Sequence, residues 1–212
     1  SAVQPSCDIA GALLCESFDV PLSEQYAVSE VDGMATAIQD CRVHSGSGAI
    51  RFTSEAAGKS QVQMPLLSPV NGGALYARWY AFLPSGLSMS QYLIMLELWP
   101  GDWAQRVTVE GVGDDRLEVY QGTTGATLVS AAGTFPRDRW VCLELGLELS
   151  ATAGAASLSA DGVQLVAQSS LANLPSSPID EVVLSAVPYT DAVGVDLTLD
   201  DLVVGTEPIG CE

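Results

Sequence analysis

Apolar and polar residues alternate along most of this chain, in short segments separated by turn residues. In 141–149 every odd position is Val or Leu, and the even positions carry Cys, Glu and Gly. In 75–83 the odd positions hold Leu, Ala and Trp, and the even ones hold Tyr, Arg and Phe. The segments 92–99 and 103–112 alternate in a similar way. A period of two is typical of β-strands with one buried face, so we predict an all-β protein.

Turn residues and breaks in the pattern divide these strands. Asp161-Gly162 predicts a tight hairpin, because both residue types tolerate the positive φ angles that such a turn needs. The pattern allows a short helix only over Met34–Gln39 or Ser170–Leu174. In the last strand the apolar positions change from odd to even at Asp200-Asp201, which predicts a bulge or a specialised carboxylate site.

Several strands therefore have one aliphatic face and one face that mixes aromatic residues with Arg and Glu. In a two-sheet antiparallel β-sandwich the aliphatic faces meet in the core and the mixed faces meet water. A length of 212 residues suits one large all-β domain. The sequence has no internal repeat and no linker-like stretch, so we predict a single domain over residues 1–212.

Composition and charge restrict the partners. An apolar fraction of 48% is enough for a real core, and 26 acidic against 8 basic residues give a net charge of −18. This charge repels nucleic acids and anionic membranes, and it disfavours an anionic polysaccharide unless local arginines or a cation reverse the field. Alternatively, the charge only keeps the protein soluble. No apolar run approaches the roughly 18 residues of a membrane helix, and no leader-like segment opens the chain, so we expect no membrane insertion and a mature or trimmed form.

Five cysteines, at positions 7, 15, 41, 142 and 211, show no zinc-binding spacing. Five choices of the odd cysteine and three pairings of the rest leave fifteen disulfide arrangements. Disulfides would indicate an oxidising compartment, and five buried thiols in a cytosolic protein are the alternative.

Four segments together resemble a known family. They are Leu13–Asp19 (LLCESFD), His44–Phe52 (HSGSGAIRF), Arg139–Glu144 (RWVCLE), and Leu199–Val204 (LDDLVV) followed by Ile209–Cys211 (IGC). In this order they resemble secreted bacterial concanavalin A-like jelly rolls of the lectin and glucanase type, in an uncharacterised branch similar to polysaccharide lyases. The resemblance spans nearly the whole chain and implies a concanavalin A-like jelly-roll sandwich. It says less about function, because this fold includes lectins, lyases, hydrolases and inert modules.

The resemblance also bears on cysteines and metal. The similar proteins have cysteines at the positions of Cys7, Cys15, Cys142 and Cys211, and cysteines near the chain ends suit covalent ties there. We therefore expect the disulfides Cys7–Cys15 and Cys142–Cys211, with Cys41 free and buried. The resemblance further implies a structural Ca²⁺ bound by Glu16 and Asp200, with backbone oxygens near Asp40. Solvated surface carboxylates are the alternative.

Catalytic signatures are missing from the sequence. The E-x-D-x-x-E strand of laminarinase-type glycosidases is absent, because Glu97 has no acidic residue two positions on. The R-x-E-x-R and Q-x-H strands of alginate lyases are also absent. His44 is the only histidine and lacks the context of a nucleophilic triad, so we interpret it as a structural hydrogen-bonding residue. The sequence favours a non-enzymatic role.

The mixed strand faces suggest a ligand groove. If 75–83, 92–99 and 103–112 are neighbours in one sheet, their outward faces offer aromatic, Arg and Glu side chains to a sugar. These candidate ligand-binding residues are Tyr76, Arg78, Tyr80, Glu97, Trp99, Arg106 and Glu110. Trp103, beside Asp102, is a further candidate for stacking. Ordinary half-buried strand residues that pair across strands are the alternative.

The sequence thus predicts a monomeric, secreted or cell-surface, non-catalytic carbohydrate-binding module that recognises a polysaccharide on its concave sheet. A polysaccharide lyase or glycoside hydrolase with a non-standard site at Arg78, Tyr80 and Glu97 is the second hypothesis. A structural or adhesive surface module is the third.

Overall fold

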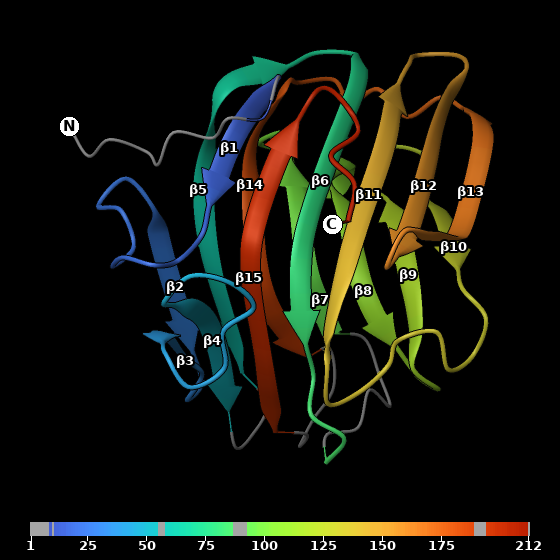
Figure 1. The fold of residues 1–212 in the computed structure, drawn as a ribbon. Helices are drawn as coiled ribbons and strands as arrows, with labels where there is room; N and C mark the ends of the chain where they lie inside the picture. Colours follow the sequence, from blue (N-terminus) through green and yellow to red (C-terminus); the bar gives the residue numbers. More distant parts are fainter. Residues whose placement is uncertain (1–8, 10, 55–57, 87–92, 189–193, 212) are drawn as a thin grey trace.

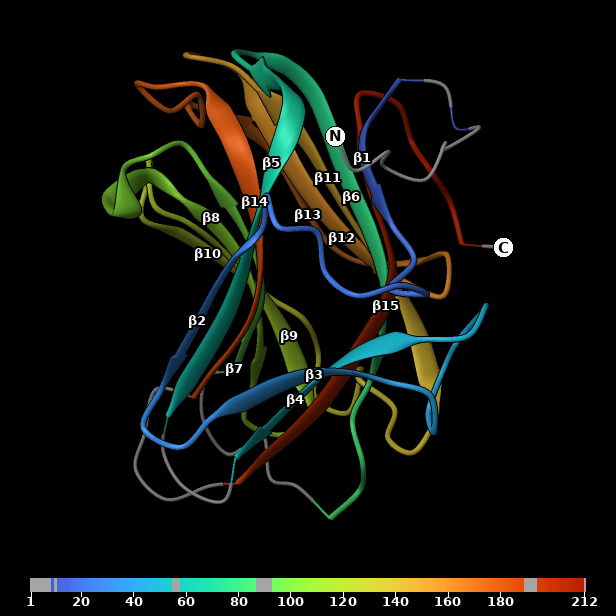
Figure 2. The ribbon, with the colours of Figure 1, turned by 90° about the vertical axis from the view of Figure 1, so that its left-hand side faces the viewer.

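Two antiparallel sheets packed face to face form the body of the protein (Figures 1 and 2). The computed structural model describes residues 9, 11–54, 58–86, 93–188 and 194–211. The predicted all-β sandwich is confirmed: within these ranges the single helical segment is a 3-10 turn at Trp103–Gln105. No helix in the described ranges has the length and apolar content needed to cross a bilayer.

The strands divide into a seven-stranded and an eight-stranded sheet. The eight-stranded sheet has the spatial order β13 (Val163–Leu171), β12 (Gly154–Ala160), β11 (Trp140–Leu149), β6 (Gly73–Phe82), β15 (Val195–Gly205), β4 (Ala49–Ser54) and β3 (Ala35–Gln39), and β1 (Ala12–Glu16) also pairs with β15. The seven-stranded sheet has the order β10 (Ala126–Val129), β9 (Arg116–Gln121), β8 (Val107–Val112), β7 (Leu93–Trp99), β14 (Ile179–Pro188), β5 (Lys59–Val70) and β2 (Ala27–Val31). We call the face of each sheet that points away from the other sheet its outer face.

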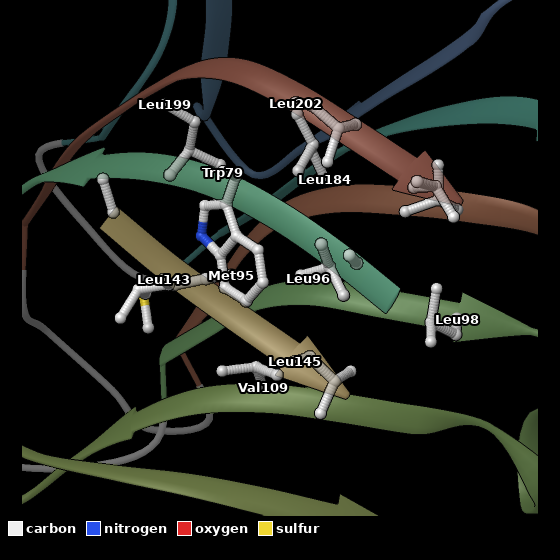
Figure 3. Packing of buried hydrophobic residues seen from close by; sticks show 14 of the residues in the cluster. Trp79, Met95, Leu96, Leu98, Val109, Leu143, Leu145, Leu184, Leu199 and Leu202 are labelled. Carbon is white, nitrogen blue, oxygen red and sulfur yellow. The ribbon is translucent and has the colours of Figure 1, made fainter. Parts of the chain in front are cut away.

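The core lies between the sheets and follows the predicted alternation. Every odd residue of 75–83 and of 141–149 is buried in one hydrophobic cluster. Figure 3 shows Trp79 of β6 among leucines of both layers, and its side chain is fully buried. Since burial of each large apolar side chain contributes roughly 1.5–3 kcal/mol, this alternation determines which face of each strand points inward.

In β7 the predicted faces are partly wrong because of a bulge. The pairing of β7 with β8 shifts register between Ile94 and Leu96. The shift brings Leu93 and Met95 into the same core cluster as Leu96 and Leu98, although the sequence pattern places the two pairs on opposite faces. An uninterrupted apolar run gives no sign of where a bulge inserts its extra residue. Tyr92, at the start of the predicted segment, lies outside the described residues.

Neither predicted helix forms. Residues 35–39 are strand β3, which pairs residue by residue with β4, and Ser170 and Leu171 end strand β13. Residues 35–39 and Leu171 pair with neighbouring strands, and this tertiary pairing overrides weak local helix propensity.

The two predicted backbone irregularities are confirmed. Asp161 and Gly162 have φ angles of 49° and 76° and connect β12 to β13. In β15 the register against β6 shifts between Asp200 and Val203, and Asp201 has a φ of 48°. β15 pairs with β4 before this bulge and with β1 after it. The bulge therefore lies where β15 changes partners along one edge.

The cysteine predictions are confirmed in part. Cys142 of β11 is bonded to Cys211, which fixes the C-terminal segment on the eight-stranded sheet. Cys15 is also disulfide-bonded, and its predicted partner Cys7 lies outside the described residues. Cys41 is free as predicted, but it is exposed, so the prediction that it is buried is wrong. It lies in the loop between β3 and β4, on the surface of the protein.

Candidate functional site

The predicted ligand residues do not share one surface. Tyr76, Arg78 and Tyr80 lie in β6 of the eight-stranded sheet, whereas Glu97 and Trp99 lie in β7 of the seven-stranded sheet. Glu110 lies in β8 of the seven-stranded sheet, and Arg106 directly precedes that strand. The expected single groove is wrong, because the chain changes sheets between β6 and β7. The outer face of each sheet therefore has to be considered separately.

Three carboxyl groups form a row across the outer face of the seven-stranded sheet. Glu97 of β7 lies opposite Thr108 of β8, and Glu110 of β8 lies opposite Glu118 of β9. All three glutamates alternate with residues that point into the core, so their side chains lie on the outer face. We call Glu97, Glu110 and Glu118 the carboxylate row.

Most of the polar groups of this row are withdrawn from water. Glu97 is fully buried, and Arg106 and Glu110 are nearly so. Glu97 accepts a hydrogen bond from Gln61 Nε2 (2.8 Å), and its other carboxylate oxygen lies 3.2 Å from Arg106 Nε. Thr108 Oγ1 donates to Glu110 at 2.5 Å. The sequence predicts Glu97, Arg106 and Glu110 as direct ligand contacts, but their burial makes them the floor of this face.

Burial raises the pKa of every member of the carboxylate row. For Glu97, burial outweighs the opposing effects of Arg106 and of the hydrogen bond from Gln61 on its pKa. For Glu110, burial outweighs the hydrogen bond from Thr108 and the charge of Arg106. Burial, with the adjacent charge of Glu110, raises the pKa of Glu118 to about 7. A carboxyl group with such a pKa can donate or accept a hydrogen bond near neutral pH.

Aromatic side chains stand at one end of the row. Trp103 is 46% exposed and lies edge-to-face with Trp99, with ring centroids 5.9 Å apart. The guanidinium of Arg106 lies 3.4 Å from the centre of the Trp103 ring and 5.9 Å from that of Tyr120. We call Trp99, Trp103 and Tyr120, held together by Arg106, the aromatic platform.

The turn that carries Trp103 is held by local hydrogen bonds. Asp102 accepts from the amide of Ala104 (3.0 Å) and from Gln105 Nε2 (2.8 Å), and these two bonds lower the pKa of Asp102. Arg106 Nη1 donates to the carbonyl of Trp103 at 2.8 Å. The exposed ring is therefore positioned before any ligand binds. The sequence predicts Trp103 as a stacking residue in a loop, and its contact with Arg106 is seen only in the structure.

The predicted residues of β6 line two of the hollows that the described residues form on the outer face of the eight-stranded sheet. Tyr76 borders a hollow of about 310 Å³ together with Gly146, Ser157 and Gln168. Arg78 and Tyr80 border a second hollow of about 380 Å³. Tyr76 and Arg78 are half-buried and Tyr80 is buried, and all three lie on the opposite side of the sandwich from the carboxylate row.

In the second hollow, His44 contacts Asp201 and Tyr80, and sequence reasoning did not predict these contacts. His44 Nδ1 lies 2.7 Å from Asp201 Oδ2, and the His44 ring is stacked on Tyr80 with centroids 3.4 Å apart. The edge of Trp140 contacts the same ring at a centroid distance of 5.8 Å. The change of pattern at Asp200-Asp201 was the available signal, but only the fold brings it to His44.

Both carboxylates predicted to bind calcium accept hydrogen bonds from the protein. Glu16 accepts from the Phe18 amide (3.0 Å) and the Tyr26 hydroxyl (2.8 Å). Asp200 accepts from the amides of His44 and Asp201, each at 2.8 Å. Within the described ranges, no group of three or more His, Cys, Asp or Glu side chains is arranged for a metal ion. The Ca²⁺ site that the family resemblance implies at Glu16 and Asp200 stays a prediction.

Comparison with known proteins identifies the fold but no family. No protein-family model and no curated protein matches the sequence. Among solved structures, the cellulose-induced protein Cip1 is similar over 94% of this chain and 100% of its own, with a TM-score of 0.71 and 17% identity.

The receptor-binding domain of botulinum neurotoxin C/D mosaic serotype matches 94% of this chain with a TM-score of 0.64 and 8% identity. The botulinum neurotoxin serotype D ligand-binding domain in complex with N-acetylneuraminic acid matches 87%, with a TM-score of 0.56 and 10% identity. This chain spans only 49% and 43% of those two chains. The similarities agree with the jelly-roll sandwich fold expected from the sequence.

Proposed function

We propose that this chain is a secreted, non-catalytic carbohydrate-binding module that binds a polysaccharide at the aromatic platform of the seven-stranded sheet. The observation that carries the proposal is the exposed Trp103 ring, held in place by Trp99 and Arg106. Sugars have apolar CH faces that stack on aromatic rings, and a ring held in advance loses little entropy on binding.

The carboxylate row supplies the hydrogen-bonding groups of such a site. Sugar hydroxyls both donate and accept hydrogen bonds, and the carboxyl group of Glu118, with a pKa of about 7, can do the same near neutral pH. A neutral polysaccharide suits this face, because the net charge of −18 repels a polyanion.

Two similarities support the proposal without establishing it. One similar structure is named as a cellulose-induced protein, and another is a domain in complex with N-acetylneuraminic acid. The Cys142–Cys211 disulfide supports an extracellular location, since disulfides persist in oxidising compartments.

The test is a binding assay with a panel of insoluble cellulose and soluble neutral and acidic polysaccharides. Trp103→Ala is expected to weaken binding about tenfold or more, because it removes the exposed stacking surface. Trp99→Ala, which removes the support of Trp103, is expected to weaken binding less. Val163→Ala is the matched control, because Val163 is 65% exposed on β13 of the opposite sheet. If Trp103→Ala binds as tightly as the control, the platform is not the site.

A second candidate function, glycoside hydrolysis, is favoured by one observation. Glu110 and Glu118 lie directly opposite each other, and the pKa of Glu118 is raised to about 7. A carboxyl group that keeps its proton near neutral pH, beside a second carboxyl group, is the pair of groups that acid–base hydrolysis of a glycoside uses. Release of reducing ends from a bound polysaccharide, lost in Glu118→Gln, would establish this function. Absence of both binding and product would favour a structural or adhesive module.

A further inference from the structure

The histidine-lined hollow on the eight-stranded sheet is a formed pocket, separate from the aromatic platform. Arg78 and Tyr80 of β6, His44 and Ser45 of the loop before β4, and Asp201 of the β15 bulge line it. Its volume of about 380 Å³ lies within the range of small-molecule sites.

Arg78 differs from the other arginines in its lack of an acidic partner among the described residues. Within the described part of the chain, which includes all seven arginines, it alone makes no ion pair with a carboxylate. The other pairs are Arg42–Asp196, Arg51–Asp196, Arg106–Glu97, Arg116–Asp114, Arg137–Asp115 and Arg139–Asp161. In a chain with 26 acidic residues, an arginine without an acidic partner is unexpected.

The Nε atom of Arg78 is, moreover, buried without a hydrogen-bond partner in the described residues. The contact observed for its guanidinium is with the Tyr80 ring, 5.3 Å away. Glu144 is the cross-strand neighbour of Arg78, but its carboxylate accepts the amides of Ile209 (3.0 Å) and Gly210 (2.6 Å). A buried donor without an acceptor destabilises the folded chain, and an oxyanion ligand would supply the acceptor.

His44 provides a second polar group on the wall of the pocket. The Asp201 carboxylate is an acceptor, so Nδ1 of His44 donates to it, and Nε2 is the nitrogen left for another partner. Tyr80 and Trp140 hold the ring on two sides. Neutral His44 would accept a hydrogen bond from a ligand hydroxyl through Nε2, and protonated His44 would donate one to a ligand oxygen.

The walls of the pocket are fixed by contacts outside it. Asp200 accepts the amides of His44 (2.8 Å) and Ser45 (3.3 Å) and so holds the loop against β15. The Cys142–Cys211 disulfide and the two amide bonds to Glu144 hold the C-terminal segment. A pocket formed in advance lowers the ordering cost of binding a small ligand.

We propose that this pocket binds a small hydroxy acid, with its carboxylate on Arg78 and a hydroxyl on His44 Nε2. The guanidinium fork matches a planar carboxylate. A singly charged carboxylate also suits the pocket better than a phosphate dianion, because Asp200, Asp201 and Glu144 lie close by. This site lies on the opposite sheet from the platform. The proposal for this pocket therefore does not depend on polysaccharide binding at the platform.

The experiment uses His44 as a reporter, since it is the only histidine and gives a single set of imidazole NMR signals. Gluconate, glucitol and hexanoate are titrated near neutral pH. Glucitol is gluconate with a CH₂OH group in place of the carboxylate, and hexanoate keeps the carboxylate but has no hydroxyl. Gluconate is expected to shift the His44 signals saturably, hexanoate more weakly, and glucitol not at all.

Arg78→Gln is expected to weaken gluconate binding about ten- to a hundredfold, the range of one charge-assisted hydrogen bond. Arg139→Gln is the matched control, because Arg139 is exposed and paired with Asp161. Arg78→Gln is also expected to keep or raise the midpoint of thermal unfolding, because it removes a buried donor without a partner.

Four results would overturn the assignment. They are an equal shift with glucitol, tighter binding of inorganic phosphate or sulfate than of gluconate, unchanged gluconate affinity in Arg78→Gln, and a marked loss of stability in Arg78→Gln. The last would show that Arg78 has a structural role.

Discussion

Replacing Glu118 with Gln should stabilise this protein, and the gain should depend on pH. Glu118 lies on β9 opposite Glu110 of β8, and it is 8% exposed. Burial and the charge of Glu110 raise its pKa from 4.5 to about 7. Gln has the same shape and carries no charge, so the variant removes the cost of ionising this group in the folded chain.

The size and the sign follow from this pKa difference. Above about pH 7 the carboxyl group of Glu118 is ionised in the folded and the unfolded chain, and the folded chain bears the full cost. As the pH falls through about 7 toward 4.5, the folded chain takes up the proton first and its stability rises. The shift from 4.5 to about 7 corresponds to at most roughly 3 kcal/mol.

The assay is thermal unfolding at a series of pH values. At about pH 8.5, Glu118→Gln should raise the midpoint by roughly 5–10 °C, because 1 kcal/mol shifts a chain of this size by roughly 2–4 °C. At about pH 5 the gain should fall below roughly 1 kcal/mol, because the native group is then largely protonated in the folded chain.

The control is Glu24→Gln, which removes the same charge from an exposed position. It measures the general relief of repulsion in a chain of net charge −18. The reasoning is refuted if Glu118→Gln gains no more than the control at high pH, or if its gain is the same at every pH.

Two further predictions concern covalent and metal stabilisation. Replacing both Cys142 and Cys211 with Ser should lower the free energy of unfolding, measured in urea, by about 4 kcal/mol. The reason is that the disulfide closes a loop across a sequence separation of 69. A loss below about 1 kcal/mol would mean that removing the disulfide adds little conformational entropy to the unfolded chain. The calcium site that the family resemblance implies at Glu16 and Asp200 predicts that a calcium chelator lowers the midpoint of thermal unfolding, and an unchanged midpoint would count against the site. A clear fall with the chelator would support the calcium site implied by the family resemblance.

Much of the architecture could be read from the order of residues. The odd residues of 75–83 and 141–149 form the core as the alternation indicates, because burying the aliphatic face is the dominant gain of each strand. The bulge at Asp200-Asp201 could be predicted because it interrupts a clear pattern. The bulge in β7 could not, because the apolar residues on both sides of it leave no break in the pattern.

The candidate site could be predicted only in parts. The residue types on the mixed faces were identified, and Trp103 was recognised as a stacking candidate. The burial of Glu97 and Glu110 was not predicted, because the exposure of a side chain on an outer face depends on the neighbouring strands and loops. His44 was taken as a lone histidine because its partner Asp201 lies 157 positions away in the sequence.

By itself, the sequence determined that this protein is a sandwich of antiparallel strands and which side of most strands is buried, since a period of two is a local property of the chain. Only the tertiary structure decided which strands became neighbours. The placement of β6 and β7 in different sheets separated the predicted groove into two surfaces. It also left Arg78 beside His44 and Trp103 above the carboxylate row, because contacts between distant segments depend on how whole sheets pack.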